Sequence, residues 1–208
     1  MTVNEEWFDI YDRQMKHIGS APRSEVHAQG HWHQTFQCWV LRGDSDNRTV
    51  LLQERHLGKD TFPGYLDISC AGHLAAGESV ADGIRELHEE LGLEAAFHQL
   101  IFCGVHVEED ILEDQKIIDR EFCHVFIYEC DQPLIFYKLQ HDEVTGLYEV
   151  PIHEFQQLIS GEKSSVSVKG VRTGSDPNDP LVESARIIER KHLVPHDADF
   201  FDLLFTSI

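Results

Sequence analysis

The sequence predicts an α/β sandwich, in which helices flank a mixed β-sheet. Short apolar runs of strand length, such as 36–42 (FQCWVLR) and 49–54 (TVLLQE), lie beside stretches with helical periodicity. Strands mixed with flanking helices indicate this architecture. The chain has 208 residues, of which 41% are hydrophobic, so it is long enough for one domain with a sizeable core, or for one domain and an appendage.

The remaining elements follow in order along the chain. We predict further strands at 66–71, 98–107, 120–129 and 145–150, a helix from about Ser79 to Leu91, and a second helix that begins at Pro151. Gly92 is a natural end for the first helix, and proline is favoured in the first turn of the second. Alternating apolar residues within 120–129 indicate a strand that is covered on both faces.

The last quarter of the chain is harder to assign. Residues 160–180 are polar and rich in turn formers, which predicts a loop or lid. Residues 181–206 carry two helical patterns, VESARIIERKHL and ADFFDLLF. We therefore expect residues 161–208 to form a polar loop and C-terminal helices. These helices either pack on the same domain, cover the site or contact the partner in a homodimer.

The charge of the chain restricts its partners. It has 37 acidic and 17 basic residues, which gives a formal net charge of -20. Such a surface repels nucleic-acid phosphates and anionic lipids, so we expect neither a nucleic-acid polymer nor a membrane as partner. A small phosphorylated substrate remains compatible, because a metal and a few basic residues can reverse the field inside one cleft.

The sequence is typical of a cytoplasmic protein. Its N-terminus, MTVNEEWFDIYD, lacks the basic and then apolar order of a signal peptide. No apolar run approaches the roughly 20 residues that a membrane helix needs. The five cysteines include no C-x-x-C pair, so we expect reduced thiols.

The helix at 79–91 carries the residues suited to chemistry. Its two sides differ: Val80, Ile84, Leu87 and Leu91 form an apolar stripe, and Glu86, Glu89 and Glu90 lie opposite. Spacings of three and four residues make the carboxylates neighbours that repel one another, which a divalent cation relieves. Magnesium prefers such oxygen ligands and also binds substrate phosphates. The alternative interpretation is an ordinary solvated helix face.

The segment 72–93, GHLAAGESVADGIRELHEELGL, resembles the Nudix box, G-x5-E-x7-R-E-U-x-E-E-x-G-U, where U is bulky and aliphatic. The fixed positions are filled in order by Gly72, Glu78, Arg85, Glu86, Leu87, Glu89, Glu90, Gly92 and Leu93. Six residues instead of seven separate Glu78 from Arg85, which leaves the role of Glu78 open.

The resemblance to the Nudix hydrolase superfamily implies a Nudix-type α/β/α sandwich with a loop–helix–loop catalytic motif. Residues 1–160 would then form the Nudix domain with an N-terminal extension. The resemblance also implies that Glu86, Glu89 and Glu90 hold a divalent metal, Mg²⁺ or alternatively Mn²⁺. Arg85 belongs to the same catalytic motif and is expected to pair with Glu78 or Glu89.

Longer flanking segments are similar to a narrower branch, the Nudix proteins related to type I isopentenyl-diphosphate isomerase. The similarity covers about residues 5–160, with DIYDRQMKHIGSAPRSEVHAQGHWHQTF, LLQERHLGKDTFPGYLDISCAGH and IIDREFCHVF as its markers. It implies a metal site formed by His27, His33, His73, Asp119 and Glu121, with His31 as a substitute for His27. Chance clustering is the alternative, because the chain has 14 histidines.

The same branch implies a phosphate-binding role for Arg55 and Lys59, which precede the turn at Pro63–Gly64. The two cations are four residues apart and follow a strand, so a loop can present both to phosphate oxygens. Two solvated surface cations are the alternative. For Glu121 a second role is open, since a downstream carboxylate commonly completes a Nudix metal cluster.

We expect metal-dependent hydrolysis of a diphosphate linkage in a small molecule. The isomerase carries a catalytic cysteine before its Gly-His pair, where this chain has Ala71, and Cys70 stands one residue earlier. A shift of one residue turns a strand side chain to the other face, so Cys70 is expected in the core. Isomerisation like that of the isomerase and a non-catalytic ligand-binding module remain the alternatives.

Overall fold

A single mixed sheet organises the chain in the computed structural model, which describes residues 5–174, 176 and 179–208. Residues 1–4 of the expected N-terminal extension and residues 175, 177 and 178 of the expected polar loop lie outside the described residues. The strands are β1 (Trp7–Tyr11), β2 (His17–Pro22), β3 (Trp32–Arg42), β4 (Thr49–Arg55), β5 (Leu66–Asp67), β6 (Cys70–His73), β7 (Ile101–Leu112), β8 (Ile117–Glu129), β9 (Val144–Pro151), β10 (Val166–Arg172) and β11 (Val182–Ile188). The helices are α1 (Arg23–Gln29), α2 (Arg85–Leu91), α3 (Ile152–Ser160) and α4 (Ala198–Phe205).

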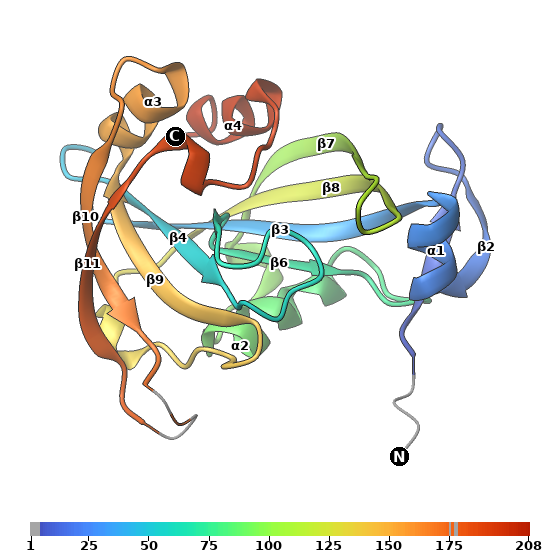
Figure 1. The fold of residues 1–208 in the computed structure, drawn as a ribbon, viewed down its shortest axis with the longest axis horizontal. Helices are drawn as coiled ribbons and strands as arrows, with labels where there is room; N and C mark the ends of the chain where they lie inside the picture. The colour runs from blue at the N-terminus through green and yellow to red at the C-terminus, as the bar shows by residue number, and fades with distance from the viewer. Residues whose placement is uncertain (1–4, 175, 177–178) are drawn as a thin grey trace.

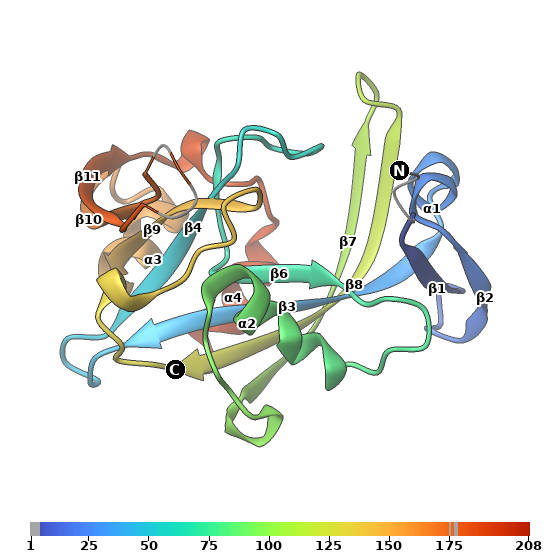
Figure 2. The same ribbon diagram turned by 90° about the horizontal axis from the view of Figure 1, so that it is seen from below.

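Strand β3 lies at the centre of the sheet. It pairs in parallel with β8 and antiparallel with β1, β4 and β6, so the sheet is mixed. The hairpin of β1 and β2, together with α1, closes one end of the molecule, and β9, β10 and β11 form the other end (Figure 1). Seen from below, the hairpin of β7 and β8 rises beside α1 (Figure 2).

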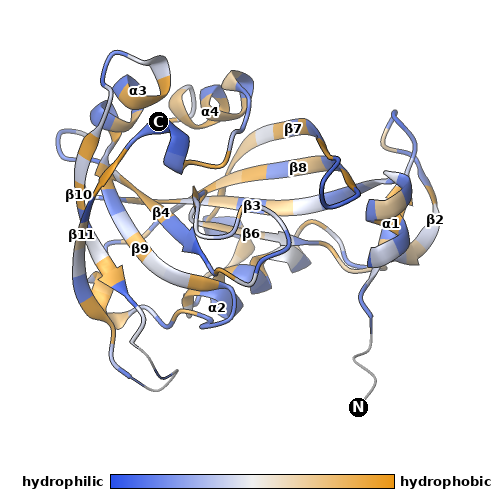
Figure 3. Ribbon diagram, viewed as in Figure 1, coloured by the Kyte–Doolittle hydropathy of each residue, from blue (hydrophilic) through white to orange (hydrophobic). Residues whose placement is uncertain are grey.

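Alternate residues of β3 enter two hydrophobic cores. Trp39 and Leu41 belong to the core that contains residues of α3 and α4, whereas Phe36 and Cys38 belong to the core on the α2 side. In Figure 1, α4 accordingly lies above β3 and α2 lies below it. Figure 3 shows the hydrophobic character of α4, which buries three apolar side chains in the first core. The predicted α/β/α sandwich with a mixed sheet is confirmed.

The predicted strands at 36–42, 49–54, 98–107, 120–129 and 145–150 correspond to β3, β4, β7, β8 and β9. The predicted strand at 66–71 is divided, because β5 pairs with β4 and β6 pairs with β3. Gly92 ends α2 with a φ of 67°, as predicted. The predicted second helix is α3, which begins at Ile152, one residue after Pro151. The helix expected from Ser79 is shorter: residues 82–84 form a 3-10 turn and α2 begins at Arg85.

Two predictions for the last quarter of the chain are wrong. Within the predicted polar loop, residues 166–172 form β10, and VESARIIERKHL forms β11 followed by a 3-10 turn instead of a helix. Strands β10 and β11 pair along seven residues, and the apolar Val166, Val168 and Ile188 enter the first core. This pairing and burial outweigh the helical propensity of 182–188. The helix predicted from ADFFDLLF is confirmed as α4.

The C-terminal segment packs on the same domain, which is one of the alternatives that the sequence left open. Val168, Ile188 and Phe200 share a core with Trp39 of β3. The N-terminal extension is also folded, as β1, β2 and α1. None of the helices in the described part of the chain is long and apolar enough to cross a membrane.

The substitution Gly170→Ala tests the addition of β10 to the sheet. A Cβ at Gly170 would overlap the carbonyl oxygen of Leu147 in β9. Because backbone atoms cannot move aside cheaply, we expect this substitution to lower the free energy of unfolding by about 1–3 kcal/mol in chemical denaturation. Ser167→Ala, on the exposed face of β10, is the control and should change it by less than about 0.5 kcal/mol. Equal effects would contradict the pairing of β9 with β10.

Candidate active site

A cleft of about 440 Å³ opens where β3, β6 and β8 meet α2 and the loop after β4. Eight of the site residues predicted from the sequence line it: Arg55, Lys59, His73, Arg85, Glu86, Glu89, Glu90 and Glu121. His27 and Asp119 line it too, whereas His31 and His33 are not among its lining residues. The cleft therefore brings together predicted residues as far apart in the sequence as His27 and Glu121.

Helix α2 presents its carboxylates to the cleft because its opposite side is fixed in the core. Leu87 and Leu91 are fully buried on the core side. Glu86 and Glu90 are 8% and 4% exposed at the cleft, whereas the side chain of Glu89 is about half exposed. Gly72 of β6 makes room for this arrangement, since a Cβ there would overlap the carboxyl group of Glu86.

The guanidinium of Arg85 connects the parts of the motif. Its Nε and Nη2 donate to the two carboxylate oxygens of Glu78 at 2.8 and 3.0 Å. Its Nη1 donates to Glu86 at 2.5 Å and to Glu89 at 2.8 Å. Its Nη2 also donates to the carbonyl oxygen of His73 at 2.9 Å. The shortened spacing between Glu78 and Arg85 thus still allows a bidentate pair, and Arg85 contacts both of its expected partners.

Burial makes the charges of Glu86 and Glu90 costly. It raises the pKa of Glu86 to about 7. Burial, followed by the repulsion from Glu86, raises the pKa of Glu90 to about 8. Gln53 Nε2 and the Ala71 amide donate to Glu90 Oε2 at 3.3 and 3.2 Å, which compensates only part of this cost. A cation between these oxygens would offset the repulsion, so the α2 carboxylates fit a divalent metal.

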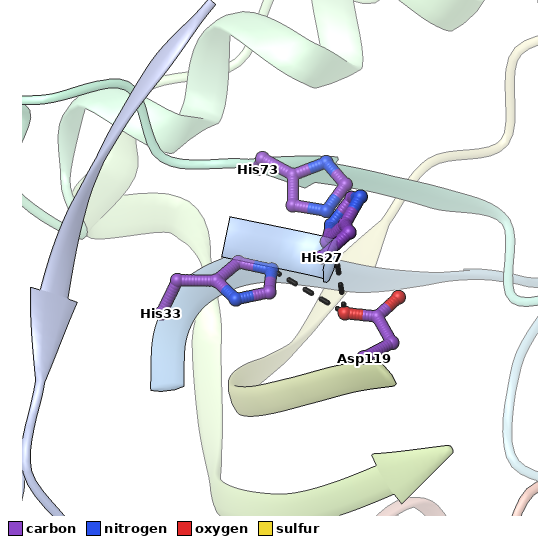
Figure 4. A group of neighbouring side chains, drawn as sticks. All are labelled: His27, His33, His73 and Asp119. Atoms are coloured by element: carbon purple, nitrogen blue, oxygen red, sulfur yellow. Dashed lines mark ion pairs between the residues drawn. The ribbon is translucent and has the colours of Figure 1, made fainter. Parts of the chain in front are cut away.

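A second group of side chains converges next to the first (Figure 4). His27 comes from α1, His33 from β3, His73 from β6 and Asp119 from β8. One ligand atom from each lies within 4.8 Å of the others. The Nε2 atoms of the three histidines and Oδ1 of Asp119 are buried and have no hydrogen-bond partner among the described residues.

The electrostatics of this histidine group (His27, His33, His73 and Asp119) also fit a metal. Burial lowers the pKa of His27 to about 4 and that of His33 to about 3, and it lowers the pKa of His73 well below its ordinary value. The three imidazoles are therefore neutral, which is the form that binds metals. Buried nitrogens without a hydrogen bond are costly unless a ligand satisfies them.

His31 does not substitute for His27. Its ring is not part of the histidine group, although its carbonyl oxygen accepts a hydrogen bond from His33 Nδ1 at 3.1 Å. Glu121 lies beside the group, with Oε1 at 3.4 Å from His73 Nε2 and 3.8 Å from His33 Nε2. Its Oε2 accepts a hydrogen bond from Thr35 at 3.0 Å. Among the described residues, Glu121 thus contacts the histidines and not the α2 carboxylates.

The two predicted phosphate-binding cations line the cleft, but both already have partners. Arg55 donates to Asp67 Oδ2 at 3.0 Å and to the Thr61 carbonyl oxygen at 2.9 and 3.2 Å. Lys59 pairs with Glu143. They are therefore ordered groups and not solvated surface cations.

His196, which no sequence motif singles out, lines the cleft from the segment between β11 and α4. Its ring is hydrogen-bonded to Asp67 and Glu108, each at 2.8 Å. Nothing in the local sequence marks this histidine among the others of the chain, because its partners lie 129 and 88 residues away.

The prediction that Cys70 lies in the core is confirmed. Cys70 is 0% exposed and packs in the core on the α2 side. Ala71 faces the cleft in its place.

The raised pKa values predict how metal binding stabilises the protein. Between pH 4.5 and about 8 the folded chain binds more protons at Glu86 and Glu90 than the unfolded chain does. Without metal, the contribution of these two groups to stability falls as the pH rises through this window. Mg²⁺ offsets the negative charge of these buried carboxylates. We therefore expect Mg²⁺ to raise Tm more at pH 8 than at pH 5, by a difference of about 3 °C or more.

Differential scanning calorimetry of the wild type and of Glu90→Gln measures this difference. The variant removes one of the two titrating charges, and its Tm should respond less to Mg²⁺ at pH 8. A Tm increase that is the same at both pH values would show that the α2 carboxylates do not hold the metal.

Known proteins resemble this chain along most of its length. The NUDIX domain family matches residues 31–168. An uncharacterised Nudix hydrolase of Clostridium acetobutylicum is 36% identical over 206 residues, which cover 99% of this chain and 98% of that protein. An isopentenyl-diphosphate Delta-isomerase of Mycolicibacterium vanbaalenii is 40% identical over 152 residues, which cover 68% of this chain and 75% of that protein.

A solved structure shares the fold. The crystal structure of a Deinococcus radiodurans protein has a TM-score of 0.54 and 16% sequence identity, and the match covers 76% of this chain and 91% of that one. The resemblance predicted from the box at 72–93 and from its flanks is therefore confirmed by similarity to both groups of proteins.

Proposed function

Because the chain belongs to the Nudix hydrolase family, whose activity is the hydrolysis of phosphorus anhydrides, we propose that it cleaves the diphosphate linkage of a small molecule with divalent metal in the cleft. One observation carries this proposal: the carboxylates of α2 line the same cleft as Arg55 and Lys59. The cleft thus combines oxygen ligands for metal with cations for phosphate.

Two groups of side chains would hold metal. The α2 carboxylates, Glu86, Glu89 and Glu90, offer only oxygen and suit Mg²⁺ or Mn²⁺. The histidine group, with Glu121 beside it, mixes imidazole and carboxylate, a donor set that suits Zn²⁺, Mn²⁺ or Fe²⁺. A bound divalent cation would neutralise charge on the phosphate oxygens and lower the pKa of a bound water.

The side chains of the cleft would bind the substrate phosphates, orient the metal ligands and deprotonate the attacking water. Arg55 donates to phosphate oxygens from a position fixed by Asp67, and Lys59 binds them by exchanging Glu143 for the substrate. Arg85 holds Glu86 and Glu89 in place. A carboxylate oxygen of α2 accepts a proton from the attacking water. The water oxygen bonds to phosphorus, the bridging P–O bond breaks, and two phosphorylated fragments, or one fragment and orthophosphate or pyrophosphate, leave.

Isomerisation is the second candidate, because the histidine group and the similarity to isopentenyl-diphosphate isomerases favour it. It needs a proton donor and an acceptor on either side of a five-carbon unit. The methyl group of Ala71 faces the cleft where the resemblance implies a thiol, and the Cys70 thiol is in the core. This difference supports hydrolysis.

Replacement of a single carboxylate tests the proposal. We expect Glu90→Gln and Glu89→Gln to lower kcat by about 10²–10⁴-fold, because a neutral amide neither holds the cation nor accepts a proton. The assay is phosphate or pyrophosphate release from a panel of diphosphates with Mg²⁺ or Mn²⁺.

Glu94→Gln provides the matched control, since Glu94 follows α2 and its side chain is 87% exposed. It should leave kcat unchanged. Isopentenyl diphosphate belongs in the panel, with carbon products identified by NMR. Unchanged turnover in Glu90→Gln would refute the assignment of the carboxylates, and a double-bond shift without phosphate release would favour isomerisation.

A further inference from the structure

His196 enters the cleft from outside the part of the chain that matches the NUDIX domain family, which ends at residue 168. Two contacts seat its segment on the sheet: the Val194 amide donates to the Leu66 carbonyl oxygen at 2.9 Å, and Leu193 forms a bridge with Leu66. The imidazole stacks on Phe200 of α4, with 4.2 Å between ring centroids. Because Phe200 is fully buried, the ring of His196 has a fixed support.

Both ring nitrogens of His196 face carboxylates. Nε2 lies 2.8 Å from Asp67 Oδ1, and Nδ1 lies 2.8 Å from Glu108 Oε1. Burial lowers the pKa of His196, but the two hydrogen bonds outweigh it and raise the pKa to about 10. The ring is therefore an imidazolium that donates to both carboxylates at neutral pH.

The network continues from Asp67 to the proposed phosphate-binding arginine. Oδ2 of Asp67 accepts a hydrogen bond from Arg55 Nη1 at 3.0 Å, while Oδ1 is shared by His196 and the Ile68 amide. The side chain of Asp67 is 6% exposed, so its orientation is set by these partners. His196 is thus connected to Arg55 through one residue, Asp67.

Charge balance shows what the histidine contributes. Asp67 and Glu108 carry two negative charges, and His196 and Arg55 supply two positive ones. Without the imidazolium, no positive charge would lie between Asp67 and Glu108, and Arg55 would be the cation left beside Asp67. The guanidinium of Arg55 would then be drawn further towards the carboxylates, and fewer of its N–H donors would be available to a phosphate group.

We propose that His196 is a positioning residue of the cleft: through Asp67 it holds Arg55 ready for the substrate diphosphate, and through Glu108 it ties β7 to the same point. This inference rests on the proposed function, because it assigns Arg55 to phosphate. It extends the site to a segment near the C-terminus that lies beyond the family match.

His196→Phe is the first variant to test, because it keeps an aromatic ring on Phe200 and removes both donors. We expect KM for the diphosphate substrate to rise about tenfold with a smaller change in kcat, since substrate binding is what Arg55 supplies. His106→Phe is the matched control. His106 is also buried and also contacts the Phe200 ring, at 5.4 Å, but does not line the cleft, so KM should stay unchanged.

A double-mutant cycle separates positioning from general damage. Arg55→Ala should raise KM strongly in the wild type and much less in His196→Phe, because the histidine acts through this arginine. Lys59 pairs with Glu143 and lies outside the network, so Lys59→Ala should raise KM by the same factor in both backgrounds. Coupling to Lys59 as strong as the coupling to Arg55 would overturn the proposal.

The same double-mutant cycle can be measured without turnover. The measured quantity is then the Kd for inorganic pyrophosphate with Mg²⁺, from titration calorimetry. A wild-type chain that binds pyrophosphate but hydrolyses no diphosphate would refute the proposed function and still report on His196 through Kd. His196→Gln keeps one donor and should weaken binding less than His196→Phe, which provides a milder variant if the ring exchange impairs folding. A folded His196→Phe or His196→Gln variant with wild-type KM and Kd would overturn the proposal.

Discussion

The hydrogen bonds of the Arg85 guanidinium hold the candidate active site together. One side chain joins the loop before α2 at Glu78, the helix itself at Glu86 and Glu89, and β6 at the His73 carbonyl oxygen. Since β6 supplies the backbone on which His73 stands, the α2 carboxylates and the histidine group share one anchor. Arg85 thus orients Glu86 and Glu89 and fixes the backbone of β6 at His73, whereas Glu90 is held by Gln53 and the Ala71 amide.

Carboxylates dominate the lining of the cleft that we propose to bind phosphate. Its lining includes the α2 carboxylates, Asp67, Glu108, Asp110, Asp119 and Glu121, whereas its arginines and lysine are already paired. Burial, followed by repulsion from neighbouring carboxylates, raises the pKa of Asp110 to about 6 and that of Asp119 well above its ordinary value. A diphosphate adds negative charge to this space, so bound cations are the physical condition for its entry.

The sequence predicted the parts of the fold and site that depend on local spacing. Helical spacing places Leu87 and Leu91 on the core face of α2 and Glu86 and Glu90 on the cleft face. Because this spacing lies within one short motif, the sequence alone predicts both faces. The local sequence does not predict β11, because the strand is stabilised by pairing with β10 and local propensity does not include such pairing. His196 was missed for the same reason, since only the folded sheet brings it to Asp67.

One part of strand β3 packs in the core and another part lines the cleft. On one face, Trp39 and Leu41 pack in the core, while Gln37 and Thr35, two and four residues before Trp39, line the cleft. The floor of the cleft is thereby continuous with the hydrophobic core, whose close packing leaves side chains little room to move. We therefore expect selectivity among substrates to come from the rim, where the loop at 58–62 and residues 140–143 meet solvent, and changes of substrate preference during evolution would be sought there first.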